Sequence, residues 1–202
     1  MFNRLNLSNC QLCDTAPALT KQVVCQGCLD DLPYASHPFD VDQITIQALF
    51  DYAWPIDRLI HLFKYQSRLD LLPLLVHPAD RLSVPRVDAL VAVPMSNQRL
   101  RERGFNHAQL LAQALGKIWQ IPLWHGVIRQ RDTHRQQSLD RLERLENLNQ
   151  AFTLTSPPPA HVMLIDDVLT TGSTLSHLAE LFLQQGSQTV CASVIASAHE
   201  QH

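Results

Sequence analysis

The chain has 202 residues, of which 46% are hydrophobic and 17% are charged, and its formal net charge is -3. This composition predicts a globular protein with one well-buried domain and room for a small appendage, and the acidic balance argues against a globally basic nucleic-acid binder. No apolar stretch has the length of a membrane span or a signal-peptide core, so a cytoplasmic protein without membrane insertion is expected.

Four cysteines near the start of the chain form two C-x-x-C pairs, Cys10 with Cys13 and Cys25 with Cys28, separated by eleven residues. In a cytoplasmic protein this spacing favours metal binding over disulfides. Four thiolates make a closed tetrahedral zinc site, which is structural because no position is left for water. The alternative is a set of reduced, reactive thiols.

Residues 29–42 contain Pro33 and Pro38 and are expected to form a turn-rich linker. The predicted domains are therefore a zinc-binding segment with its linker, residues 1–42, and a main domain, residues 43–202. The first strand of the main domain is predicted at Ile44–Tyr52. Apolar residues at helical spacing after Pro55 then predict a helix.

A second helix is predicted from Asp70 to about Leu82. The segment between the two helices contains Lys64, Tyr65 and Arg68. Two interpretations of these side chains remain open: they are either the solvated end of a helix or groups that face a ligand.

A basic loop is expected after the strand predicted at Val87–Val93. It contains Arg99, Arg101 and Arg103, and Asn106 is placed to cap the next helix, whose apolar face is expected to include Leu111, Ala114, Leu115 and Ile118. Such a loop suits one end of a diphosphorylated sugar. The alternative is a solvated basic loop that contributes to solubility.

The long polar segment 129–139 is predicted to be a surface loop able to close over a substrate, and a short helix is expected at 140–149. Arg131 and Arg135 lie in this candidate lid. Nine of the sixteen Lys and Arg residues fall between Arg99 and Arg144, whereas residues 145–202 contain neither. A phosphate site in that last part would depend on backbone amides and on arginines from the middle of the chain.

The most informative stretch runs from Val162 to Leu175. An apolar strand, Val162–Ile165, leads into Asp166 and Asp167, and the next residues are small or hydroxylic: Thr170, Thr171, Gly172, Ser173 and Thr174. Their amides and hydroxyls, at the start of a helix with apolar positions Leu175, Leu178, Ala179 and Phe182, suit a phosphate. Carboxylates at the end of a strand suit sugar hydroxyls or hydrated magnesium. The alternative is an ordinary turn whose acids cap the helix.

A final strand is predicted around Thr189–Ile195, with Cys191 as a core cysteine. The apolar run Val162–Ile165 is typical of a buried parallel strand, and its position before a helix indicates an open α/β sheet.

The stretch Ile165–Leu175 resembles the signature of type I phosphoribosyltransferases. The chain as a whole resembles the ComF family, through the cysteine pairs, the segment His61–Tyr65, the segment Arg99–Asn106 and the spacing of Thr133, Gln136, Leu139, Arg144, Asn147 and Phe152. One departure is Ser67, where many relatives carry glycine.

The resemblance implies an α/β protein with the type I phosphoribosyltransferase fold, a central, mostly parallel sheet flanked by helices, after a zinc-binding segment. The ligands expected for it are 5-phosphoribosyl diphosphate and magnesium. The 5-phosphate is expected at residues 170–174, the ribose hydroxyls at the catalytic pair Asp166 and Asp167, and the diphosphate at Arg99 and Arg103. As diphosphate leaves, a carboxylate and a closed lid would stabilise the positive charge on the ribosyl ring. The acceptor and the oligomeric state are not indicated.

The resemblance also implies a link to natural competence and DNA uptake, with a helicase partner. Two alternatives to catalysis therefore stay open: a single-stranded DNA-binding factor, with Arg101, Arg131 and Arg135 as contacts, and a regulator that senses the sugar diphosphate. The arginine-bearing segment 99–106 contains one aromatic residue, Phe105, which is little for a surface that stacks bases.

Overall fold

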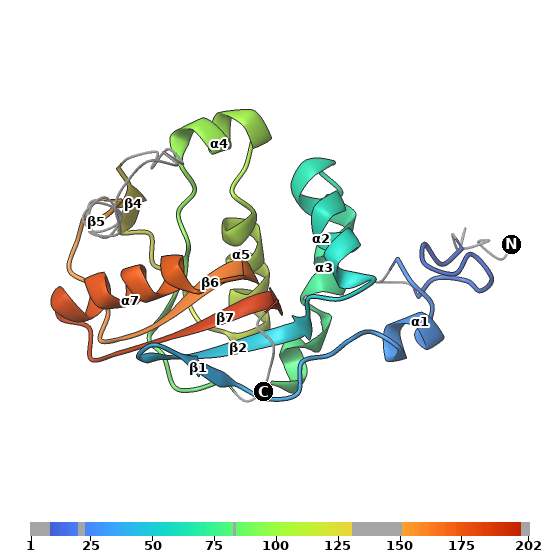
Figure 1. The fold of residues 1–202 in the computed structure, drawn as a ribbon, viewed down its shortest axis with the longest axis horizontal. Coiled ribbons are helices and arrows are strands. Elements are labelled where there is room, and N and C mark those ends of the chain that lie inside the picture. The colour runs from blue at the N-terminus through green and yellow to red at the C-terminus, as the bar shows by residue number, and fades with distance from the viewer. Residues whose placement is uncertain (1–8, 20–22, 83, 131–150, 199–202) are drawn as a thin grey trace, which may run out of the picture.

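The computed structural model describes residues 9–19, 23–82, 84–130 and 151–198. Its centre is a five-stranded sheet in the order β1-β2-β7-β6-β3 (Figure 1). The strands are β1 (Phe39–Val41), β2 (Ile44–Asp51), β3 (Ala89–Ala92), β6 (His161–Leu169) and β7 (Thr189–Ser197). The pairs β2–β7, β7–β6 and β6–β3 are parallel, and β1 alone is antiparallel to its neighbour. The predicted α/β fold with a mostly parallel sheet is confirmed.

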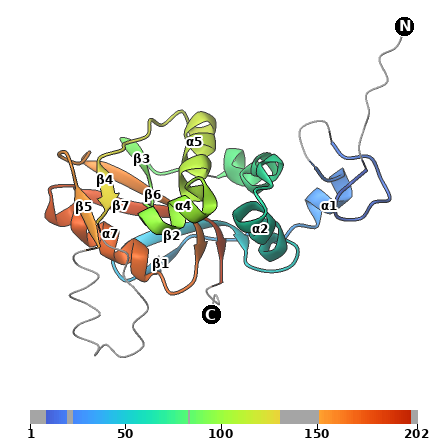
Figure 2. The same ribbon diagram turned by 90° about the horizontal axis from the view of Figure 1, so that it is seen from above.

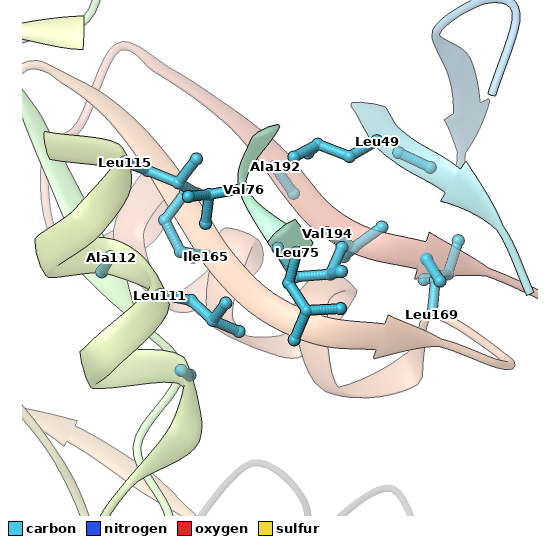
Figure 3. Close-up of a cluster of buried hydrophobic side chains, with 14 of the residues drawn as sticks. Leu49, Leu75, Val76, Leu111, Ala112, Leu115, Ile165, Leu169, Ala192 and Val194 are labelled. Carbon is cyan, nitrogen blue, oxygen red and sulfur yellow. The ribbon is translucent and has the colours of Figure 1, made fainter. Parts of the chain in front are cut away.

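Helices α5 (His107–Trp119) and α7 (Ser173–Gln184) lie on opposite sides of the sheet (Figure 2). The predicted apolar positions of α7 are all buried. On the α5 side, Leu111 and Leu115 meet Leu75, Val76 and Ile165 in a tightly packed cluster (Figure 3). Because both sides of the sheet are covered, β6 and β7 are apolar through most of their length, as expected for parallel strands buried on both faces.

The helix predicted at 70–82 was wrong as a continuous element. The chain instead forms η1 (Leu69–Leu71), α3 (Leu72–Leu75) and η2 (His77–Arg81). Pro73 and Pro78 each stand in the first turn of a new short helix. Proline lacks the N–H that an uninterrupted helix needs at these positions, so the apolar periodicity continues while the helix does not. The helix expected after Pro55 is present as α2 (Ile56–Tyr65).

The predicted arginine loop is in fact a helix, α4 (Asn97–Arg103). The Ser96 hydroxyl accepts a hydrogen bond from the backbone N–H of Arg99, 3.3 Å away, and Gly104 ends the helix with a φ of 81°. No residue of α4 is buried, so the apolar spacing that reveals most helices is missing here. The predicted cap of the next helix is confirmed, because Asn106 accepts from the N–H of Ala108 at 3.1 Å.

The face of α5 that meets the core is rotated from the predicted one. Leu111 and Leu115 are fully buried, as expected, but the remaining buried positions are His107, Ala108, Ala112 and Gly116. Ile118 is 38% exposed. The chain that follows α5 approaches the helix closely at Gly116, because a Cβ added there would lie 2.9 Å from the Ile121 carbonyl oxygen.

The cysteine-bearing segment, with α1 (Gln26–Asp30), lies at one end of the molecule, beside α2 (Figure 1). The expected linker 29–42 contains the edge strand β1. A small two-stranded antiparallel sheet of β4 (Val127–Arg129) and β5 (Phe152–Leu154) completes the fold. The candidate lid beyond residue 130 and the helix expected at 140–149 lie outside the described residues. Among the residues described, no helix is long and apolar enough to cross a membrane.

Candidate functional site

A polar cavity of about 530 Å³ opens where β3 and β6 separate. The last hydrogen bond of this pair joins the Val93 N–H to the Ile165 oxygen at 2.9 Å, and the chain after β3 then turns away. Ligands of open α/β sheets bind at such carboxyl-end crevices. The charged residues that line this central pocket are Lys64, Arg99, Glu102, Arg103, Arg129, Asp166 and Asp167.

The sequence predicted the two acids after the end of their strand. They lie inside β6 instead, because the strand continues to Leu169. Successive side chains of a strand point to opposite faces, so Asp166 and Asp167 have different surroundings although both line the pocket. Asp167 Oδ1 lies 2.8 Å from Lys64 Nζ of α2, and both side chains are mostly buried. Asp166 instead accepts the N–H of Asp167 at 2.8 Å.

Burial raises the pKa of Asp166 to about 7, and the negative charge of Asp167 acts in the same direction. The hydrogen bond from the Asp167 N–H and the charges of Lys64 and Arg129 oppose this rise. The adjacent acids therefore differ, since Asp167 pairs with the Lys64 ammonium group whereas Asp166 gains a proton near neutral pH.

The C-terminal turn of α2 contributes a second wall of the pocket. Arg103 Nη2 donates to the Tyr65 hydroxyl at 3.1 Å, and its guanidinium lies 4.7 Å from the centre of the Tyr65 ring. Ser67, also on the wall, has a φ of 53°, a left-handed conformation that glycine adopts without strain. The departure at Ser67 noted in the sequence therefore falls at the position where glycine has a conformational reason to occur.

Arg68 has neither of the roles proposed from the sequence. Its guanidinium binds the Asp70 carboxylate at 2.6 and 2.8 Å and the Gln11 side-chain oxygen at 2.6 Å. Gln11 lies between Cys10 and Cys13, so Arg68 joins the cysteine segment to the end of α2. Of the three side chains with two open interpretations, Lys64 and Tyr65 face the pocket and Arg68 is a structural link.

The predicted phosphate loop connects β6 to α7. Gly172 has a φ of 76°, and a Cβ built on it would lie 2.7 Å from Cγ1 of Val41 in β1. Thr170, Thr171 and Ser173 are exposed, and the hydroxyls of Thr171 and Ser173 lie 3.1 Å apart. Ser173 begins α7, and no side chain caps the start of this helix. The first-turn N–H groups of α7 thus remain available to an anion.

The structure brings part of the predicted set together. Asp166, Asp167, Arg99, Arg103 and Thr174 line one pocket, while Arg101 is exposed on α4 away from it. Arg131 and Arg135 lie outside the described residues. Arg129 was expected only as the first residue of the candidate lid, because it stands at the start of a polar run. The structure makes it the last residue of β4 and part of the pocket lining, with its guanidinium 5.3 Å from the Phe152 ring centre.

A buried histidine lies behind the pocket wall. His107 is fully buried, with its ring 4.7 Å from that of Phe105 and 5.3 Å from that of Phe63. Burial, with the positive charge of Arg103, lowers its pKa, so the imidazole is neutral at physiological pH. Its position at the start of α5 gave no separate signal in the sequence.

The four cysteines of the N-terminal segment converge. Their Sγ atoms all lie within 4.8 Å of one another, and Cys10 and Cys25 are buried. The Thr15 hydroxyl donates to Cys13 Sγ at 3.1 Å, and its hydrogen bonds lower the pKa of Cys13 to about 6. Four clustered thiols, one of them readily ionised, fit a metal such as zinc.

Comparisons with known proteins agree with the sequence resemblance. The chain is 34% identical over 186 residues to the DNA utilization protein YhgH of Escherichia coli (strain K12), covering 86% of this chain and 78% of that protein. It is 30% identical over 224 residues to competence protein F of Haemophilus influenzae, covering 94% and 96%. The chain belongs to the ComF family. Competence protein ComFC of Bacillus subtilis is 38% identical over 100 residues, which cover 48% of this ComF protein and 39% of that one.

No family model matches the chain. Among solved structures, it is similar to the glutamine phosphoribosylpyrophosphate amidotransferase of B. subtilis, with a TM-score of 0.43 and 14% identity over 60% of this chain and 25% of that one. It is also similar to the hypoxanthine phosphoribosyltransferase of Trypanosoma cruzi, with a TM-score of 0.35 and 13% identity over 79% and 80%. Likenesses this distant add nothing about the site of the ComF protein.

Proposed function

We propose that the central pocket binds 5-phosphoribosyl diphosphate and that the protein serves competence or DNA utilisation, the roles that the names of its relatives indicate. One observation carries the ligand assignment. Two carboxylates of β6 and the cations Lys64, Arg99, Arg103 and Arg129 line a single cavity beside an exposed hydroxyl loop at a helix start. A sugar that carries phosphates at both ends needs this combination of groups.

The pocket suggests a placement for each part of the ligand. The 5-phosphate would bind at residues 170–174, where the amides of the first turn of α7 are available. The diphosphate would bind Arg99 and Arg103, which α4 places one helical turn apart. The ribose hydroxyls would donate to Asp166 and Asp167.

Magnesium fits the donor set only in part. Asp167 already pairs with Lys64, so Asp166 is the carboxylate with the greater freedom to bind the ion. Magnesium, when bound, would neutralise charge on the diphosphate. Because the pKa of Asp166 is raised to about 7, a proton competes for the same oxygen below neutral pH.

The reaction that follows from this placement is glycosyl transfer with release of diphosphate. Arg99 and Arg103 would hold the leaving group, and the Asp167 carboxylate would lie near the positive charge that develops on the ribosyl ring. A sensor of the same ligand would need the binding groups but no acceptor.

Calorimetry with 5-phosphoribosyl diphosphate and magnesium tests the ligand assignment. We expect saturable binding, weakened about tenfold or more in Arg99→Ala because a charged hydrogen bond is lost. Arg86→Ala, an exposed arginine remote from the pocket, is the matched control. Absence of binding by the unaltered protein would overturn the proposal.

Diphosphate release across a panel of acceptors distinguishes enzyme from sensor. An enzyme should release diphosphate with the right acceptor and lose this activity in Asp167→Asn. Binding without turnover on any acceptor would support the sensor.

A further inference from the structure

One side of helix α2 carries exposed aromatic and basic side chains that no packing contact in the described part of the fold explains. Arg58, His61 and Tyr65 are spaced by three and four residues, so they lie along one face of α2, and all are exposed. Trp54, in the turn before the helix, is 71% exposed, and Tyr65 is 60% exposed. We call these four residues the aromatic stripe.

Two rings of the stripe, those of His61 and Tyr65, are held in place and are not merely exposed. The His61 and Tyr65 ring centres lie 4.9 Å apart. The guanidinium of Arg103, on α4, lies 4.7 Å from the centre of the Tyr65 ring. The hydrogen bond from Arg103 to the Tyr65 hydroxyl fixes this pair further. Ordered rings lose little conformational freedom when another ring stacks on them.

Exposed rings with guanidinium groups between them suit one class of ligand. Bases of a single strand stack on aromatic side chains, and its phosphates pair with arginines. In a duplex the bases are already stacked on one another, so it cannot use such rings. Arg58 lies within the stripe and Arg103 lies at its end, so positive charge is present at both places. Asp57, the neighbour of Arg58 in α2, partly offsets this charge.

We propose that the aromatic stripe is a docking surface for single-stranded DNA that leads to the rim of the central pocket. The stripe and the pocket share Tyr65, and Arg103 touches both. The choice of DNA over RNA rests on the role proposed above, whereas the surface itself does not depend on binding of the sugar diphosphate. The two proposals therefore fail separately.

Fluorescence anisotropy with a labelled thymidine oligonucleotide tests the surface on the full chain. We expect Trp54→Ala and His61→Ala each to weaken binding, by about tenfold for the tryptophan, whereas Trp54→Phe retains most of the affinity. Neither residue lines the pocket, so calorimetry with the sugar diphosphate should be unchanged in both variants. Urea denaturation shows that both variants are folded, whether or not the sugar diphosphate binds.

A matched pair of arginine variants separates a defined surface from general charge. Arg58→Ala should weaken binding several-fold and reduce its salt dependence, while Arg86→Ala should change neither. Equal losses in both variants, or unaltered affinity in Trp54→Ala, would overturn the docking surface. Equal affinity for a uridine oligonucleotide would overturn the choice of DNA over RNA. Equal affinity for a duplex would overturn the inference that bases stack on the exposed rings.

Discussion

Lys64 and Asp167 meet at 2.8 Å, and this ion pair joins α2 to the central strand β6. The two side chains are only 17% and 15% exposed, so solvent screens the pair less than it screens a surface salt bridge. The pair links α2 to β6 and places an ammonium group beside one of the two acids of the site. It thus connects the fold directly with the chemistry of the pocket.

Replacing Lys64 with Met keeps the length of the side chain and removes its charge. We expect the free energy of unfolding to fall by about 1–3 kcal/mol, because Asp167 is left partly buried without a partner. Urea denaturation measures this, with the exposed Lys117→Met on α5 as the control. A double-mutant cycle with Asp167→Asn should show coupling of about 1 kcal/mol or more. Additive effects of the two changes would contradict the pairing.

The raised pKa of Asp166 predicts a pH dependence of stability. Its pKa rises from a usual value of 3.8 to about 7 in the folded protein. Between these values the folded state holds a proton that the unfolded state has released, so the contribution to stability falls as the pH rises through this window. Because the pocket is open to solvent, we expect at most about 2 kcal/mol from this group.

Asp166→Asn should therefore flatten the pH dependence and be more stable than the unaltered protein above about pH 7. Urea denaturation at several pH values checks this, with the exposed Asp51→Asn as control. An unchanged slope would show that the Asp166 carboxyl titrates normally. In the same variant, loss of magnesium-dependent binding of the sugar diphosphate would support the cation role proposed for Asp166.

Gly172→Ala tests the phosphate loop. The positive φ and the 2.7 Å approach to Val41 both oppose a Cβ, so we expect a loss of about 1–3 kcal/mol in the free energy of unfolding and weaker binding of the sugar diphosphate. Gly27→Ala is the matched control, since it has open space around it and no positive φ. Equal effects of the two changes would contradict the strained turn.

The clustered cysteines predict one tightly bound zinc per chain. Zinc analysis should show an equimolar amount that disappears in Cys10→Ser and Cys25→Ser, accompanied by a lower thermal unfolding temperature. Cys191→Ser should keep the metal, because Cys191 lies in β7, far from the cluster in sequence and structure. Zinc retained in both cluster variants would contradict the site.

The parts of the site that were predictable are those with a local signal. An apolar strand, two acids and a glycine-hydroxyl turn follow one another in sequence, so their order in space follows from the strand-to-helix connection. The different surroundings of Asp166 and Asp167 could not be predicted from the sequence. They depend on how far β6 continues and on the contact with Lys64, a residue far away in the sequence.

The aromatic stripe shows why surfaces are harder to predict than cores. The helical spacing of Leu59, Ile60 and Phe63 predicts α2. The residues His61 and Tyr65 lie on the other face and add nothing to that pattern. Within the arginine-bearing segment 99–106 the sequence contains one aromatic residue, Phe105. The rings that meet Arg103 come instead from α2, through a tertiary contact.

Strand β1 has a consequence for any attempt to divide the molecule. Val41 lies against Gly172, and Asp42 accepts a hydrogen bond from the Ser176 hydroxyl of α7 at 2.5 Å. A shortened protein that began at residue 43 would leave out both contacts, together with the whole edge strand. Removing the cysteine segment at that point would also remove the contacts that support the phosphate loop. Loss of ligand binding in such a protein would therefore not show that the metal takes part in binding.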